Sequence, residues 1–193
     1  MALETLFADM EALYARNGLT FSTRPPLNLA VIQAFEAKEN LRLPPDLVEF
    51  FTRTDGSGSQ RWACATRKAP MQILSFQECV KLFDQNWPCG TIQMAVPDCG
   101  RITPRAATSA RVKWLPFADF NGTTTAICDL EPGSKGVVGQ VVIYRMPDSV
   151  EVVADSFEEF MRQSVAELSS DFSRALLFMG TLDRPPLPPS GPK

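Results

Sequence analysis

Four short segments rich in β-branched residues follow one another in the second half of the chain, separated by turn sequences. They cover residues 112–117, 123–130, 137–144 and 150–154, and the turns are Asn121-Gly122, Pro132-Gly133 and Pro147-Asp148. Tight turns of this kind join antiparallel neighbours, whereas parallel strands need a long crossover. We therefore expect an antiparallel meander, in which 137–144, apolar on both faces, is a central strand.

Segments with helical periodicity come before and after these strands. The predicted helices cover 3–16, 29–39, 45–53, 76–85, 157–168 and 170–179, and further short strands are expected at 61–65, 71–74 and 91–96. In the second helix Leu29, Ile32 and Phe35 are expected to face inward. The order predicts an α+β fold with N-terminal helices, a central mostly antiparallel sheet with helices packed on it, and a C-terminal helix.

The chain of 193 residues contains no histidine. This removes the commonest general base, the Ser-His and Cys-His catalytic pairs and most zinc chemistry. An enzyme would have to use carboxylates, lysine or a thiol such as Cys89 or Cys99, and no constellation of that kind stands out. We therefore expect a non-catalytic protein with no catalytic, cofactor-binding or metal-binding residues and no bound cofactor.

The five cysteines are widely spaced and odd in number, which favours reduced thiols in a cytoplasmic protein. No segment approaches the roughly 20 apolar residues of a membrane span, so we expect no membrane association. The charged N-terminal segment repeats like a helix and does not resemble a signal peptide.

The formal net charge of −3 conceals two segments of opposite sign. Residues 50–113 hold an excess of basic side chains, and residues 114–171 an excess of acidic ones. The basic excess includes Arg101, Arg105, Arg111 and Lys113 in a stretch without acids. These charges either pair with the acidic half or meet an acidic partner; nucleic acid is disfavoured because no recognition motif accompanies them. The acidic segment would suit a basic protein partner.

The length suits one domain, which we place at 1–183. The irregular basic segment 86–111 is the least regular part of that domain. Residues 184–193 form a proline-rich tail that we expect to be extended or disordered.

Six residues are candidates for partner binding: Trp62, Trp87, Arg101, Arg105, Asp119 and Asp129. Tryptophan and arginine dominate the energetics of many interfaces. Trp62 can equally be a core residue of an early strand. Asp119 and Asp129 could form a carboxylate pair, but the simpler interpretation is that each accepts hydrogen bonds from the amides of a nearby turn.

Three strings, in this order, resemble the SUKH superfamily, which is named for yeast cell-wall-synthesis regulators and includes many bacterial members. The first is the run LRLPPDLVEFF, residues 41–51, followed by Thr54-Asp55-Gly56. The second is WLPFAD, residues 114–119, followed by Asn121-Gly122. The third is the run VADSFEEF, residues 153–160. The resemblance spans about residues 30–165, with the helix at 3–16 added before it.

The resemblance implies function by binding. Bacterial members resemble immunity proteins that bind and neutralise a cognate toxin, often a nuclease, whose gene lies nearby. Eukaryotic members resemble regulatory interaction proteins. We therefore expect a protein partner, with an immunity-type function as the first hypothesis, a regulatory scaffold as the second and an enzyme as the third.

Overall fold

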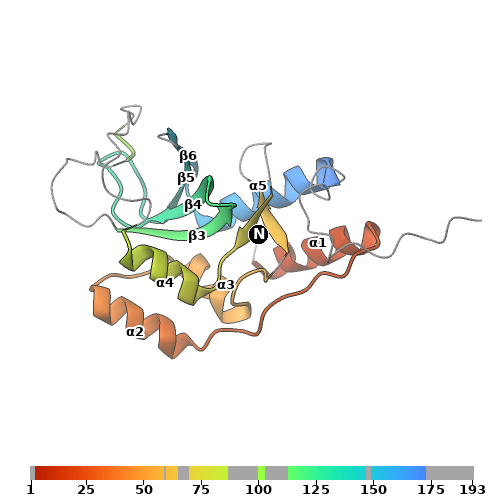
Figure 1. The fold of residues 1–193 in the computed structure, drawn as a ribbon, viewed down its shortest axis with the longest axis horizontal. Helices are drawn as coiled ribbons and strands as arrows, with labels where there is room; N and C mark the ends of the chain where they lie inside the picture. Colours follow the sequence, from red (N-terminus) through yellow and green to blue (C-terminus); the bar gives the residue numbers. More distant parts are fainter. Residues whose placement is uncertain are drawn as a thin grey trace, which may run out of the picture.

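A computed structural model of the chain describes residues 3–58, 60–64, 70–86, 100–102, 113–146 and 149–172. Its helices are α1 (Leu3–Arg16), α2 (Leu29–Glu39), α3 (Pro45–Arg53), α4 (Phe76–Asp84) and α5 (Phe157–Ser170). Its strands are β1 (Arg61–Cys64), β2 (Pro70–Ile73), β3 (Trp114–Phe120), β4 (Thr124–Asp129), β5 (Gln140–Arg145) and β6 (Ser149–Ala154). The predicted α+β order of helices, meander and final helix is confirmed (Figure 1).

The six strands form one antiparallel sheet whose spatial order, β1-β2-β3-β4-β5-β6, repeats the order along the chain. The expectation that 137–144 contains a central strand is confirmed, because β5 pairs with β4 on one side and with β6 on the other, but the strand is shorter than predicted. The strand begins only at Gln140, because Gly139 turns the chain with a φ of +93°. Val137 and Val138 consequently lie in the β4–β5 turn, 50% and 60% exposed.

Both faces of β5 are buried, as its sequence predicts. Val141 and Ile143 of β5 belong to the main hydrophobic core, which the sheet shares with the helices. Val142 and Tyr144 point to the opposite face and join a smaller cluster around Trp114. Side chains of β5 alternate between the two faces of the sheet, and the strand therefore contributes to two separate apolar clusters.

Aromatic side chains hold the helices to the first strands. The ring of Phe50 in α3 lies 4.9 Å from that of Phe157 in α5, and its other neighbours include Phe7 of α1 and Trp62 of β1. Phe50 stacks on Phe7 and packs edge to face with Trp62 and Phe157, and aromatic pairs of both kinds stabilise a core beyond the burial of apolar area. This packing also fixes the positions of α3 and α5 relative to the sheet.

Local capping explains where the helices begin. The side chain of Asn28 accepts the N–H of Ala30 at the start of α2. Ser75 and Glu78 form a capping box at the start of α4, each accepting the backbone N–H of the other. Ser156 accepts the N–H of Glu159 and caps α5 in the same manner.

The predicted strand 91–96, most of the helix 170–179 and the proline-rich tail 184–193 lie outside the described residues.

Candidate functional site

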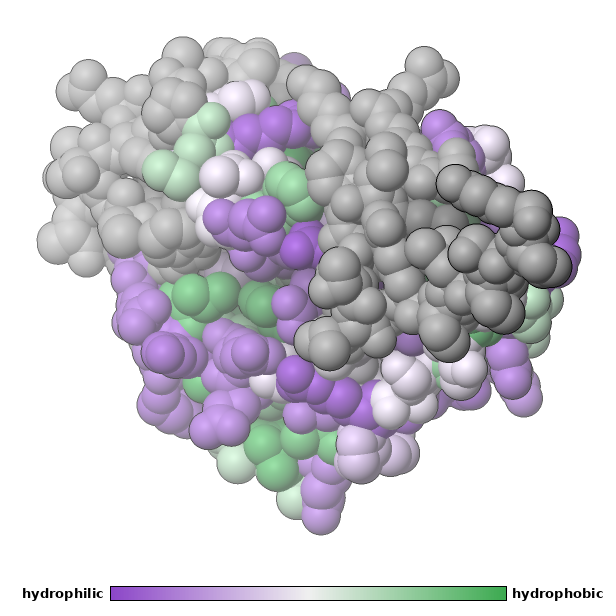
Figure 2. Space-filling view, turned by 45° about the vertical axis from the view of Figure 1, so that its right-hand side comes forward, coloured by the Kyte–Doolittle hydropathy of each residue, from purple (hydrophilic) through white to green (hydrophobic). Residues whose placement is uncertain are grey.

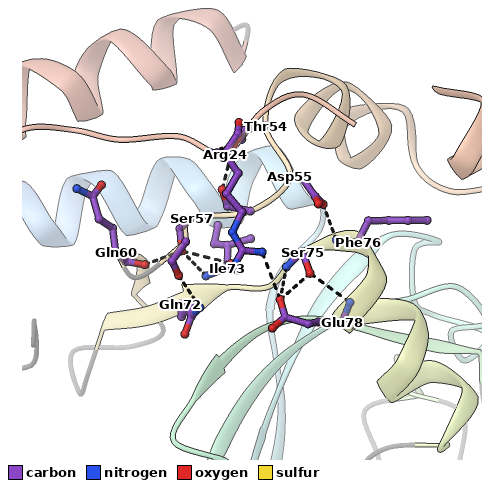
Figure 3. A network of polar contacts seen from close by, with 12 residues as sticks. Arg24, Thr54, Asp55, Ser57, Gln60, Gln72, Ile73, Ser75, Phe76 and Glu78 are labelled. Carbon is purple, nitrogen blue, oxygen red and sulfur yellow. Dashed lines mark hydrogen bonds and ion pairs between the residues drawn. The ribbon is translucent and has the colours of Figure 1, made fainter. Parts of the chain in front are cut away.

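The segment between α3 and β1 joins four elements of the fold through polar contacts (Figure 3). The hydroxyl of Thr54 donates to the carbonyl of Gly56. A carboxylate oxygen of Asp55 accepts the N–H of Phe76, the first residue of α4, at 2.6 Å. The hydroxyl of Ser57 accepts the N–H of Ile73 in β2 at 2.9 Å. These bonds fix the start of α4 against the end of α3.

Gly56 allows this close approach. Its φ is +86°, and a Cβ atom at this position would lie 2.5 Å from the carbonyl oxygen of Leu74. A side chain would therefore push the segment away from the end of β2. The Asp55-Gly56 pair thus has two structural roles, since Asp55 accepts the first amide of α4 and Gly56 lets the chain pass the sheet.

An apolar groove of about 510 Å³ lies between α2 and α4. Its lining residues come from the linker before α2, from both helices and from the α3–β1 segment: Leu27, Val31, Ala34, Phe35, Lys38, Asp55, Phe76, Gln77 and Val80. We call this feature the α2–α4 groove. Six of its nine lining residues are apolar, which is the composition of a surface that binds apolar groups.

The floor of the groove is aromatic. The ring of Phe35 in α2 lies 5.6 Å from that of Phe76 and 5.3 Å from that of Phe83, both in α4, and each pair packs edge to face. Phe76 in turn packs against Phe51 of α3. The two helices are therefore held side by side through buried rings, as Figure 1 shows below the sheet.

The two charged residues of the lining are already engaged within the chain. The ammonium of Lys38 lies 3.0 Å from a carboxylate oxygen of Glu39 and 3.3 Å from one of Asp84. Hydrogen bonds to Glu39 and to Asp84 raise the pKa of Lys38. The carboxylate of Asp55 accepts the N–H of Phe76.

Two hydrophobic side chains of α2 reach the surface, one of them in the lining of the groove. Leu29 is 44% exposed and Val31 48% exposed, both on α2. Figure 2 shows hydrophobic surface at the bottom of the molecule, the level at which Figure 1 places α2. The expectation that Leu29 faces inward is therefore wrong, whereas Ile32 and Phe35 are buried as predicted.

A comparison with protein families matches residues 26–163 to the SMI1/KNR4 family, also called SUKH-1. The match covers more than half of the chain and includes α2, α4 and the whole sheet. The chain belongs to the SMI1/KNR4 family. A search of curated proteins gave no match.

The structure gives physical reasons for the strings that resemble the SMI1/KNR4 family. In the first string Asp46 accepts the N–H of Glu158, which belongs to the third string. Asp55 and Gly56 at the end of the first string anchor α4 beneath the sheet. The first and third strings are therefore coupled through a contact between the N-termini of α3 and α5.

Trp62, a candidate for partner binding, lies in the core of this SMI1/KNR4 domain. Its side chain is 1% exposed, and its ring lies 4.8 Å from that of Phe21. The indole N–H donates to the side chain of Gln60. Of the two interpretations that the sequence left open, the structure favours the core residue, and Trp62 offers no surface to a partner.

Asp119 and Asp129 do not form a carboxylate pair. Asp119 accepts the N–H of Gly122 at 2.8 Å, and Asp129 accepts the N–H of Glu131 at 3.1 Å, so both bind turn amides as the simpler interpretation expected. Trp114 pairs with Asp129 across β3 and β4. Asp119 lies five residues after Trp114 along β3. At the rise of a strand, this places Asp119 about 16 Å from Trp114 and from the paired Asp129.

Arg101 pairs with the acidic half of the chain. Its guanidinium forms an ion pair with Asp155 and also approaches the side-chain oxygen of Gln140 at 3.5 Å. This favours the interpretation that the basic segment is balanced within the chain. The other two candidates, Trp87 and Arg105, lie outside the described residues.

Two thiols are described, Cys79 and Cys128, and both are buried. Burial raises the pKa of each well above its ordinary value, and nearby carboxylates add to this effect. They are therefore neutral side chains of the core. Among the residues with described positions, no three His, Cys, Asp or Glu side chains are grouped so that they could hold a metal ion.

Sequence reasoning missed the α2–α4 groove. The available signal was the composition of α2, whose first seven residues, LAVIQAF, carry no charge although the helix lies near the surface.

No helix among the described ranges is long and apolar enough to cross a membrane.

Proposed function

We propose that this protein is a non-catalytic binding protein of the immunity type, which binds a toxin encoded near its own gene and neutralises it. Membership of the SMI1/KNR4 family supports this proposal because bacterial proteins of the SUKH superfamily resemble immunity proteins. The observation that carries it is the apolar α2–α4 groove, whose lining includes the half-exposed side chain of Val31. Exposed apolar surface beside a groove is typical of a protein-binding site.

Part of the charge of the acidic segment is balanced or buried within the chain. Arg145 forms an ion pair with Glu151, and Arg101 forms one with Asp155. The carboxylate of Asp129 is buried. Of the ten acids in residues 114–171, one is thus buried and two form ion pairs within the chain, which reduces the acidic charge available to a basic partner.

The experiment is co-expression with the product of the adjacent gene. We expect the neighbouring protein to co-purify with this one, and we expect co-expression to restore growth when the neighbour is toxic. Pull-down at about 50 mM and about 500 mM salt separates apolar binding, which persists, from electrostatic binding, which is screened. Absence of both complex and rescue would contradict the proposal. A complex without toxicity would instead favour a regulatory scaffold.

A further inference from the structure

The solvent-facing side of α2 is free of charge over about two and a half turns. Its exposed residues before Lys38 are Leu29, Ala30, Val31, Gln33, Ala34 and Ala37. Beyond them, the charges that line the groove are engaged within the chain, Lys38 with Glu39 and Asp84, and Asp55 with the N–H of Phe76. The nearest further cation on α4, Lys81, is exposed but does not line the groove.

We propose that the α2–α4 groove binds an apolar, uncharged face of a helix supplied by the protein partner. The proposal rests on the proposed function and adds the chemistry of the partner segment. A partner charge placed against Val31 or Ala34 would lose its water without gaining an opposite charge. Complementarity therefore selects a segment whose contacting residues are apolar.

The shape of the surface favours a helix over an extended strand. The α2–α4 groove lies between two helices held side by side, and a third helix fits such a groove by ridge-into-groove packing. Ala30 and Ala34 lie one turn apart on the exposed side and leave room for close approach. From Leu29 to Lys38 the helix runs for about 14 Å, which matches roughly two and a half turns of a partner helix.

Binding of this kind has a distinct signature. Because apolar burial is not screened by salt, affinity should change by less than about threefold between about 50 mM and about 500 mM salt. An arginine in the groove should block binding of the partner helix. Ala34→Arg places a long charged side chain among the lining residues, whereas Ala37→Arg makes the same change one turn away on an exposed position outside the lining.

The test uses the full chain and synthetic helical peptides as probes. The first peptide has an alanine–glutamine background and leucines at positions i, i+4 and i+7. The second carries lysine beside each leucine, and the third carries glutamate there. Affinities are measured by fluorescence anisotropy. We expect the uncharged peptide to bind at least about tenfold more tightly than either charged peptide, with Ala34→Arg reducing its affinity about tenfold or more and Ala37→Arg leaving it within about twofold.

Three results would overturn the inference: no binding of the uncharged peptide, stronger binding of a charged peptide, or equal effects of the two arginine variants. Light scattering of the full chain tests the remaining possible occupant of the groove, a second copy of this chain. A dimer that Ala34→Arg dissociates would show that the second copy, and not a partner helix, occupies the groove. Rescue of growth without peptide binding would reject this inference and leave the proposed function standing. Peptide binding without a complex or rescue of growth would support this inference and contradict the proposed function.

Discussion

The carboxylate of Asp46 in α3 accepts the backbone N–H of Glu158 in α5 at 2.9 Å, although 112 residues separate them. The other oxygen of the same carboxylate accepts the N–H of Leu47 in its own helix. Amides in the first turn of a helix lack partners within the helix, and an acidic group beside them is stabilising. One side chain therefore serves the N-termini of two helices.

Asp46→Ala should lower the free energy of unfolding by about 1–2 kcal/mol, because amides of both helix ends lose their acceptor. Asp46→Asn retains one acceptor oxygen and should lose less. Urea denaturation followed by circular dichroism measures the change. Asp9→Ala, at an exposed position of α1, is the control and should have little effect; equal losses at the two positions would contradict the shared-cap interpretation.

Gly56→Ala should lower the free energy of unfolding by more than about 3 kcal/mol. The new methyl group would meet the carbonyl oxygen of Leu74 at 2.5 Å in a backbone conformation with positive φ. Gly18→Ala is a matched control, since Gly18 has a φ of +71° but nothing within 4 Å of a built Cβ. It should cost only about 1 kcal/mol, the strain of positive φ alone. Similar midpoints of thermal unfolding for the two variants would show that the contact with Leu74 is unimportant.

Cys79 and Cys128 should resist alkylation in the folded protein at about pH 8. Burial raises the pKa of both thiols, so they remain protonated and out of contact with reagent. Peptide mapping by mass spectrometry after iodoacetamide treatment should find both unmodified until guanidinium unfolds the chain. Modification in the native protein at the rate of the unfolded chain would disprove their burial.

Asp129 should make the stability of the protein decrease as the pH rises from about 4. Burial raises the pKa of its carboxyl group, partly offset by the hydrogen bond from Gln140. Between the unfolded pKa, about 3.9, and the raised folded pKa, the folded state binds more protons than the unfolded state. The contribution of Asp129 is thus fully present below the unfolded pKa and is lost as the pH rises through the folded pKa.

Comparison with Asp129→Asn isolates this contribution, because asparagine does not titrate. Urea unfolding of both proteins from about pH 3 to pH 7 should show the wild type losing stability relative to the variant as the pH rises through this window. A difference independent of pH, or one of opposite sign, would show that the carboxyl group does not titrate in this manner.

Local chemistry explains which parts of the fold were predictable. Asn28, the Ser75–Glu78 capping box and the Asn121-Gly122 turn each depend on contacts within a few residues. All the residues that form each feature therefore stand together in the sequence. The position of β5 beside the edge was not predictable, because apolar residues on both faces indicate burial on both faces and do not specify the place of the strand in the sheet.

The candidate site depended on contacts between distant segments. Whether Trp62 is core or interface is decided by Phe7 and Phe21, which lie some 40 to 55 residues earlier and pack on its ring. In the same way, the exposure of Leu29 follows from how α2 lies against α4. Helical periodicity alone assigned Leu29 to the inner side of α2.

The position of α5 has a consequence for synthesis of the protein on the ribosome. This last described helix packs against β5 and β6, which immediately precede it, and also against β1 and α1 at the opposite edge of the sheet. The core around Phe50 and Phe157 therefore cannot close while α5 is still inside the exit tunnel. A nascent chain stalled before residue 157 should remain sensitive to protease, and it should become resistant only after α5 has emerged.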